Sequence, residues 1–203
     1  MIEVLKPGLE TCVQDYPGRK GAFGMGFPPS GPIDHWSFRL ANILVGNEPG
    51  AAALECQFIG PALKFTTSAV VSLCGSDMAA TLDGALVPLW QSVAVSAGQV
   101  LELGSAINGA RAYLAIAGGI DTPPFLGSRA TFVLGECGGL NGAPLKAGSE
   151  IPVGAGDGAY AVEADGFALV NVGVSIAIEG GYGASFIYNP DSETPYFVVS
   201  KSW

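Results

Sequence analysis

Short apolar runs separated by glycine-rich turns recur along most of this chain, and this rhythm limits its fold more than any other feature. Runs with the length and composition of β-strands cover residues 51–58, 69–74, 79–82, 85–89, 93–95, 100–103, 110–117 and 167–178. Asp83-Gly84 and Asp165-Gly166, each flanked by apolar residues, are typical of tight hairpins. There is no regular alternation of strands with helices, which excludes nucleotide-binding sheets of the Rossmann and P-loop types. The pattern predicts an all-β barrel or sandwich.

One segment departs from this rhythm and predicts a single clear helix over residues 35–45. Asp34 is a good N-cap, and Ile33 and Phe38 occupy the two positions of a hydrophobic staple. Gly46 followed by Asn47 supplies a left-handed stop. Local physical chemistry therefore explains Asp34 as a device that starts a helix.

The polar side of this helix carries His35, Arg39 and Asn42 at positions i, i+4 and i+7. One interpretation is a solvated face of an amphipathic helix. The other is that Arg39 or Asn42 points into a polar pocket floored by the preceding loop, where Ser30 offers a hydroxyl and Gly31 allows close backbone approach. The density of turn formers and polar residues in segment 13–45 favours the second interpretation.

Further candidate residues lie outside the helix. Gln14 and Asp15 precede a Pro-Gly turn, and Arg129 lies in another turn. Strict alternation puts Glu55 on the face opposite Leu54, so Glu55 either lines a polar inner surface or faces solvent.

Composition and charge exclude several classes of function. The 203 residues carry a net charge of −9, and the nine Lys and Arg are spread singly, so no basic stripe is available for nucleic acid. No apolar run is long enough for a bilayer, and the first residues do not resemble a signal peptide, so we expect no membrane partner and a cytoplasmic location. Four separated cysteines and one histidine make a metal site improbable. The low charge density is compatible with a homo-oligomer.

A series of segments in order resembles the biotin-dependent carboxyltransferase family, which includes allophanate hydrolase subunit 2-like proteins, a 5-oxoprolinase subunit and the carboxyltransferase domain of urea carboxylase (urea amidolyase). The segments are 13–19 (VQDYPGR), 28–34 (PPSGPID), 38–42 (FRLAN), 45–47 (VGN), 50–55 (GAAALE), 79–84 (AATLDG), 111–115 (RAYLA), 117–121 (AGGID) and 126–129 (LGSR). The resemblance covers residues 3 to about 153, and the first two segments are most similar to the urea carboxylase branch.

The resemblance implies a cyclophilin-like β-barrel and transfer of a carboxyl group from carboxybiotin to urea or a related small amide. It also implies that biotin arrives on a separate carrier domain and that ATP is used by a separate biotin carboxylase domain, with no cofactor or metal held tightly by this chain.

The motif positions suggest roles for individual residues within that reaction. Ser30 and the Gly31 N–H serve as donors in this hypothesis, and Arg39 holds a carboxylate. Gln14, Asp15 or Asp34 orients the substrate amide, and the remaining substrate-binding candidates are Asn42, Glu55 and Arg129.

The resemblance ends near residue 154, which predicts a carboxyltransferase-like barrel over residues 1–154 and a divergent β-rich segment over 155–203. A strand at 196–199 would allow that segment to close the same barrel. Because the family pattern continues into a second half that we do not find, we expect the chain to need a companion carboxyltransferase half and to be inactive or weakly active alone. Two alternatives stay open: a 5-oxoprolinase component, and a non-catalytic regulatory or interaction protein of the same family.

Overall fold

This computed structural model describes residues 1–155, 174–178, 182–189 and 194–201. Contacts within the chain divide it into two units, Met1–Ala161 and Val162–Trp203. The first unit contains every candidate residue named above, and it is described first.

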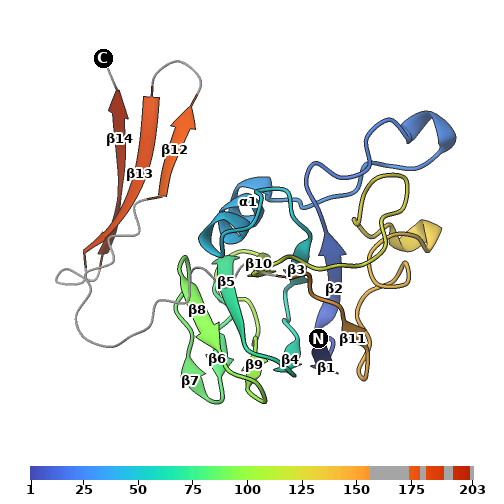
Figure 1. Ribbon diagram of the computed structural model, residues 1–203, viewed down its shortest axis with the longest axis horizontal. Helices are drawn as coiled ribbons and strands as arrows, with labels where there is room; N and C mark the ends of the chain where they lie inside the picture. Colours follow the sequence, from blue (N-terminus) through green and yellow to red (C-terminus); the bar gives the residue numbers. More distant parts are fainter. Residues whose placement is uncertain (156–173, 179–181, 190–193, 202–203) are drawn as a thin grey trace. The chain divides into compact units, whose positions relative to one another are not determined.

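Two antiparallel sheets and one α-helix make up the first unit (Figure 1). The six-stranded sheet has the order β11 (Glu150–Ile151), β1 (Ile2–Lys6), β4 (Ala62–Phe65), β9 (Val100–Glu102), β6 (Thr81–Leu82), β7 (Ala85–Leu86). The five-stranded sheet has the order β2 (Leu9–Gln14), β3 (Ala53–Gln57), β10 (Arg111–Ile116), β5 (Ala69–Gly75), β8 (Ser92–Val95). The first and last strands among the described residues of this unit are neighbours, because Ile2 pairs with Ile151.

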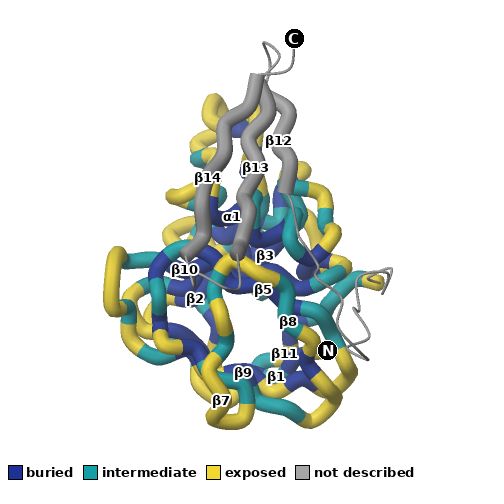
Figure 2. The backbone as a smooth tube through the Cα atoms, turned by 90° about the vertical axis from the view of Figure 1, so that its left-hand side faces the viewer, coloured by how far each residue is buried: buried dark blue, intermediate teal, exposed yellow. Residues whose placement is uncertain are grey.

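The main core lies between the two sheets, where alternate residues of facing strands point inward. Fully buried members include Leu63 and Leu101 from the six-stranded sheet and Leu54, Leu73 and Leu114 from the five-stranded sheet. Buried positions, dark blue in Figure 2, concentrate in these strands. The apolar alternation read from the sequence thus has its physical origin in two sheets that share one core.

Helix α1 (His35–Leu44) covers the outer face of the five-stranded sheet (Figure 1). Phe38 and Ala41 of the helix pack against Ala53, Tyr113 and Ala115, which are all fully buried. A buried hydroxyl adds a polar anchor, since Ser72 Oγ donates to the Ala41 carbonyl at 2.5 Å. The helix is therefore fixed to strands β3, β5 and β10 by both apolar and polar contacts.

The predicted class, all-β with one clear helix, is confirmed, although the two sheets do not close into a barrel. Among the described residues no strand ladder joins one sheet to the other. The hairpin at Asp83-Gly84 is also confirmed: it links β6 to β7, with φ of 50° and 86° at its two central residues. Two short 3-10 helices, η1 (Phe23–Met25) and η2 (Val133–Gly135), lie in loops.

The predicted start and stop of the helix are largely confirmed. Asp34 is the N-cap, and Gly46 follows the C-cap residue in the left-handed region, with φ of 76°. The hydrophobic staple was wrong, because Ile33 is 70% exposed and has little surface left to pack on Phe38. The backbone N–H of Ile33 is held by a carboxylate, as described below.

The second unit contains one three-stranded antiparallel sheet of order β12 (Val174–Ile178), β13 (Tyr182–Asn189), β14 (Thr194–Lys201). Its described strands pair with one another. The expected strand at 196–199 lies within β14, whereas the expected hairpin at Asp165-Gly166 lies outside the described residues. No helix in the described part of the chain is long and apolar enough to cross a membrane.

Candidate functional site

The loop before α1 rests on the turn that follows β2, backbone against backbone. Arg19 N–H donates to the Pro29 carbonyl at 2.6 Å, and Gly31 N–H donates to Gln14 Oε1 at 2.9 Å. A Cβ on Gly18 would lie 2.5 Å from the Pro29 oxygen, so only glycine permits this approach. The Gly31 N–H, expected as a free donor, is thus already occupied by Gln14.

A buried arginine braces these loops from behind. Arg19 is 1% exposed and donates through Nε to the Phe125 carbonyl (3.2 Å), through Nη1 to Pro28 (3.3 Å) and through Nη2 to Ala130 (2.8 Å). Its guanidinium also lies 5.3 Å from the centre of the Phe125 ring. Sequence reasoning missed this role because nothing local distinguishes a bracing arginine from a solvated one.

The side chains of Asp15 and Arg129 are also hydrogen-bonded to residues of these loops. The Asp15 carboxylate accepts from Ser128 Oγ and from the Arg129 N–H, both at 2.6 Å. The Arg129 guanidinium donates to the Thr122 carbonyl (2.6 Å) and to Asp121 Oδ1 (2.8 Å). These contacts tie the turn at 126–129 to the end of β2, and both side chains are hydrogen-bonded within the protein.

Asp34 uses its carboxylate to start the helix. It accepts from the N–H groups of Trp36 and Ser37, both at 3.1 Å, and from Ser37 Oγ at 2.5 Å. Its own N–H donates to the Tyr113 hydroxyl at 2.8 Å. The side chain is therefore an N-cap whose oxygens are occupied within the first turn.

Glu55 lies beneath the end of the loop, and its side chain is 12% exposed. Its Oε2 accepts from the Ile33 N–H and from the Tyr113 hydroxyl, both at 2.9 Å. Its Oε1 lies 3.4 Å from Arg111 Nε, an ion pair without hydrogen-bond geometry. Glu55 therefore takes neither of the two positions considered for it, because it lies on the outer face of the five-stranded sheet beside Tyr113 and is covered there by the loop.

Asn42 is fully buried at the other end of the helix, away from the loop. Its amide donates to the Ala51 carbonyl at 2.9 Å and accepts from Asn47 Nδ2 at 2.9 Å. Asn47 continues this chain by donating to the Ile116 carbonyl at 2.8 Å. The row of His35, Arg39 and Asn42 is thus not a uniform solvated face, because its last member anchors the helix to the sheet.

The contacts of the Arg39 guanidinium are with aromatic rings. The guanidinium lies 5.3 Å from the centre of the Tyr16 ring and 5.7 Å from that of Trp36, between two exposed aromatic side chains. His35 stacks on Tyr16, with ring centres 5.7 Å apart. Arg39 Nε is buried and has no hydrogen-bond partner among the described residues. A planar cation with an unused donor, held between aromatic faces, is suited to a carboxylate or carbonyl ligand.

The structure therefore brings together part of the predicted set. Gln14, Asp15, Ser30, Gly31 and Asp34 lie in or against the loop, and Tyr16 links this group to Arg39. Ser30 has φ of 56°, a left-handed conformation that is strained for a residue with a side chain. We define the open site as Arg39, Tyr16 and Trp36, with Ser30 of the preceding loop as a further candidate; the two aromatic residues were not predicted.

The cysteines take no part in this arrangement. Burial raises the pKa of Cys12 to about 12, and it raises the pKa values of Cys56 and Cys74 further. These thiols therefore stay protonated near neutral pH and are poor nucleophiles. Among the described residues no group of three or more His, Cys, Asp or Glu is arranged to hold a metal ion.

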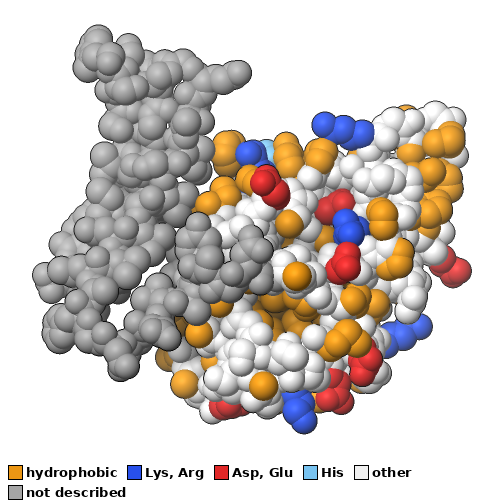
Figure 3. Space-filling view, viewed as in Figure 1, with side chains coloured by type: hydrophobic (Ala, Val, Ile, Leu, Met, Phe, Trp, Pro, Cys, Tyr) orange, Lys and Arg blue, Asp and Glu red, His pale blue; other side chains and the backbone are white. Residues whose placement is uncertain are grey.

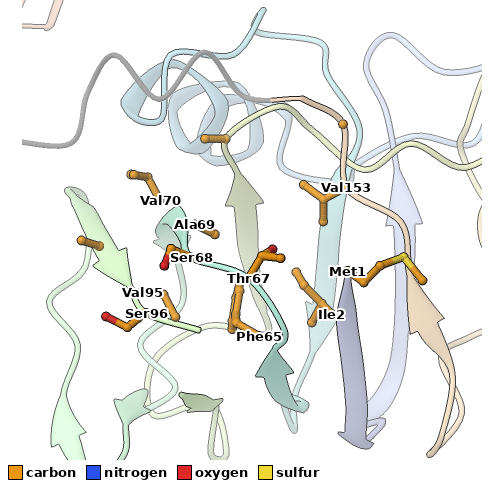
Figure 4. Close-up of a pocket in the computed structure, with 13 residues that line it drawn as sticks. Met1, Ile2, Phe65, Thr67, Ser68, Ala69, Val70, Val95, Ser96 and Val153 are labelled. Atoms are coloured by element: carbon orange, nitrogen blue, oxygen red, sulfur yellow. The ribbon is translucent and has the colours of Figure 1, made fainter. Parts of the chain in front are cut away.

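A cavity of about 380 Å³ opens elsewhere in the first unit, between strands of the two sheets (Figure 4). Ile2, Phe65, Val70, Val95 and Val153 line it, with hydroxyls from Thr67, Ser68 and Ser96. Because no acidic or basic side chain of the described residues lines it, this cavity is unsuited to charge-stabilising chemistry.

Apolar side chains are exposed in the loops that carry η1 and η2. Phe23 is 79% exposed, Met25 62% and Leu134 93%. Figure 3 shows hydrophobic side chains gathered over this end of the unit. Exposed apolar clusters of this kind often mark an interaction surface.

Comparison with known proteins gives consistent matches. A family model described as "Carboxyltransferase domain, subdomain A and B" matches residues 25–180. The chain is 48% identical over 147 residues to urea amidolyase of Saccharomyces cerevisiae, which covers 72% of the chain. It is 39% identical over 154 residues to a 5-oxoprolinase subunit of Escherichia coli, which covers 76% of the chain.

A solved structure agrees with these sequence matches. The crystal structure of Kluyveromyces lactis urea carboxylase superposes with a TM-score of 0.74 and 47% identity over 75% of the chain. The matched region is 8% of the S. cerevisiae protein, 49% of the E. coli protein and 14% of the K. lactis chain. The chain thus spans half or less of each of these relatives.

Proposed function

The chain belongs to the family of carboxyltransferase domains, subdomain A and B, and from this premise we propose that it is the carboxyltransferase component of a biotin-dependent amide carboxylase. In this role it moves a carboxyl group from carboxybiotin to urea or a related amide. Identities of 47–48% to urea amidolyase and urea carboxylase support urea. The same identities support our proposal that the two sheets of the first unit correspond to a cyclophilin-like barrel.

The unpartnered guanidinium of Arg39 is the observation that carries this proposal. Its Nε is buried without an acceptor in the described part of the chain, so a ligand would meet the two terminal nitrogens of the guanidinium instead. A carboxylate matches the planar donor fork of arginine, and the flanking rings of Tyr16 and Trp36 fix the plane of that fork. The residues present therefore fit a ligand that carries a carboxyl group.

Biotin, when bound, supplies the carboxyl group as a carboxylate on one ureido nitrogen. Arg39 binds this carboxylate, and the Ser30 hydroxyl donates to an oxygen on which negative charge develops. The amide nitrogen of the substrate loses one proton and gains the carboxyl group, and the released ureido nitrogen takes up one proton, so the exchange balances. Gln14, Asp15 and Asp34 hold the loop in place rather than touch the substrate.

The partners follow from the same proposal. ATP is used by a separate biotin carboxylase domain, and biotin is brought by a carrier domain. Because the chain spans only part of its relatives, we also propose a companion carboxyltransferase half. The exposed apolar side chains near η1 and η2, such as Phe23 and Leu134, support a protein partner at that end.

A second candidate is a 5-oxoprolinase component that acts on 5-oxoproline. The 39% identity to the E. coli 5-oxoprolinase subunit supports it. The two candidates share the open site and differ in the amide that is consumed.

Reconstitution tests the proposal. The full chain is combined with a biotin carboxylase, a biotinylated carrier and the companion half, and amide-dependent phosphate release from ATP is measured with urea or 5-oxoproline. We expect Arg39→Ala to lower kcat/KM about 100-fold, as for the loss of one charge-stabilising donor group. Lys64→Ala is the matched control, because Lys64 is an exposed cation on β4 of the other sheet. Equal activity of the two variants would remove Arg39 from the site.

A further inference from the structure

Two consecutive backbone N–H groups at the end of the loop are held by one pair of side chains beneath it. Ile33 N–H donates to Glu55 Oε2 at 2.9 Å, and Asp34 N–H donates to the Tyr113 hydroxyl at 2.8 Å. Tyr113 donates in turn to the same Glu55 oxygen at 2.9 Å. The pair lies on adjacent strands, since Tyr113 of β10 is opposite Glu55 of β3.

The same tyrosine also contacts the helix itself. Its ring meets Phe38 edge to face, with centres 5.8 Å apart and planes at 86°. Phe38 precedes Arg39 in the helix, so Tyr113 is in contact with α1 at its cap and at the residue next to the open donor. Both Tyr113 and Phe38 are fully buried, which leaves the helix little freedom to rotate at this end.

The chemistry of the pair suits a fixed support. Burial, reinforced by the nearby Glu55 carboxylate, raises the pKa of Tyr113 well above its ordinary value, so the phenol keeps the proton that it donates to Glu55. Arg111 lies 3.4 Å from the other Glu55 oxygen and donates to Gln57 Oε1 at 2.8 Å, which orients the carboxylate from the opposite side. Each oxygen of Glu55 thus has a partner within the protein.

We propose that Tyr113 and Glu55 are positioning residues, which hold the segment from Ser30 to Asp34 and the first turns of α1 so that Ser30 and Arg39 face one ligand. This inference rests on the proposed function for the identity of that ligand. It assigns Glu55 a place behind the loop, where it sets the geometry of the donors without contacting the substrate.

The first measurement needs no substrate. Amide hydrogen exchange of the full chain is compared between the wild type, Tyr113→Phe and Ser72→Ala. Ser72→Ala is the matched control, because it removes another hydroxyl that anchors α1 to the sheet, away from the loop. We expect exchange at Ile33 and Asp34 to become at least tenfold faster in Tyr113→Phe and to stay unchanged in Ser72→Ala. Equal protection of these two amides in both variants would overturn the inference.

The second measurement uses the reconstituted reaction. We expect Tyr113→Phe and Glu55→Ala to lower kcat/KM about tenfold, and Ser72→Ala to leave it within twofold. Glu55→Gln keeps an acceptor oxygen for Ile33 and Tyr113, so it should retain most of the activity that Glu55→Ala loses. If Glu55→Gln is as inactive as Glu55→Ala, the carboxylate acts chemically and the positioning role is wrong.

The two measurements separate the two proposals. A wild-type mixture that consumes neither urea nor 5-oxoproline would count against the proposed function, while the exchange data would still decide whether Tyr113 and Glu55 hold the loop.

Discussion

Arg19 and Arg39 each have a guanidinium 5.3 Å from the centre of an aromatic ring, yet the regions around them differ in what their donors meet. Around Arg19, three main-chain carbonyls accept from a side chain that is 1% exposed. Around Arg39, the buried Nε meets no acceptor within the described residues. The donors of the first region are occupied within the fold, whereas those of the second are the ones that we propose meet a ligand.

The strongest challenge to this comparison is Arg19→Met, which keeps much of the side-chain volume and removes all donors. We expect the free energy of unfolding to fall by about 3–4 kcal/mol, because the Pro28 and Ala130 carbonyls lose their donor and the Phe125 carbonyl keeps only the Ser128 N–H. Urea denaturation measures this change.

The control for Arg19→Met is Lys6→Met. Lys6 pairs with Glu102 at 2.5 Å on the surface, with side chains 70% and 49% exposed. An exposed pair of this kind contributes less than about 1 kcal/mol. Similar losses from both substitutions would contradict the bracing role of Arg19.

Gly18→Ala tests the backbone contact beneath the loop. Gly18 has φ of 78°, and an added Cβ would lie 2.5 Å from the Pro29 oxygen, so we expect a loss of about 2–3 kcal/mol in the free energy of unfolding. Gly21→Ala is the matched control, with φ of 76° and nothing within 4 Å of the added Cβ. It should cost about 1 kcal/mol, from backbone strain alone. If the two variants unfold at the same urea concentration, the loop and the turn are not held together at Gly18.

Substitutions of Asp34 test whether the start of α1 supports the fold, as the region around Arg19 does, or takes part in the reaction, as we propose for Arg39. Asp34→Ala removes the N-cap and should lower the free energy of unfolding by about 1 kcal/mol. Asp34→Asn keeps a capping oxygen and should be close to wild type in both stability and carboxylation. A loss of carboxylation in Asp34→Asn without a loss of stability would assign the carboxylate a chemical role.

The smallest expected effect on stability is that of Arg39→Ala. Only contacts with the exposed rings of Tyr16 and Trp36 are lost, so the free energy of unfolding should change by about 0.5 kcal/mol. Urea denaturation of this variant, set beside its loss of carboxylation, completes the comparison with Arg19. A loss as large as that of Arg19→Met would show that Arg39 also supports the fold.

The sequence predicted those parts of the fold that depend on local chemistry. Asp34 and Gly46 bound the helix because capping and left-handed stops are properties of a few adjacent residues. Strands β1, β2 and β4 were not predicted, because their polar residues, such as Glu3 and Lys64, interrupt the apolar run while still facing outward. The pairing of β1 with both β4 and β11 depends on distant residues and leaves no local pattern.

The candidate site was predicted in composition and only partly in arrangement. Arg39 was identified from its position beside the Ser30 loop, but its aromatic neighbours Tyr16 and Trp36 were not. Asn42 shares the predicted helix face and is nevertheless buried, because the segment that follows α1 covers it through hydrogen bonds with Asn47 and Ala51. Helical periodicity predicts the direction in which a side chain points around the helix axis. It does not predict which positions along that axis are covered by other parts of the protein.

The ladder between β1 and β11 has a consequence for evolution. Because Ile2 pairs with Ile151, the first and the last described strands of the first unit lie side by side in one sheet. A unit with its first and last strands side by side can be inserted into a longer polypeptide without rerouting its interior. The same architecture can therefore serve in a chain of very different length, as the 8% and 49% shares of its yeast and bacterial relatives illustrate.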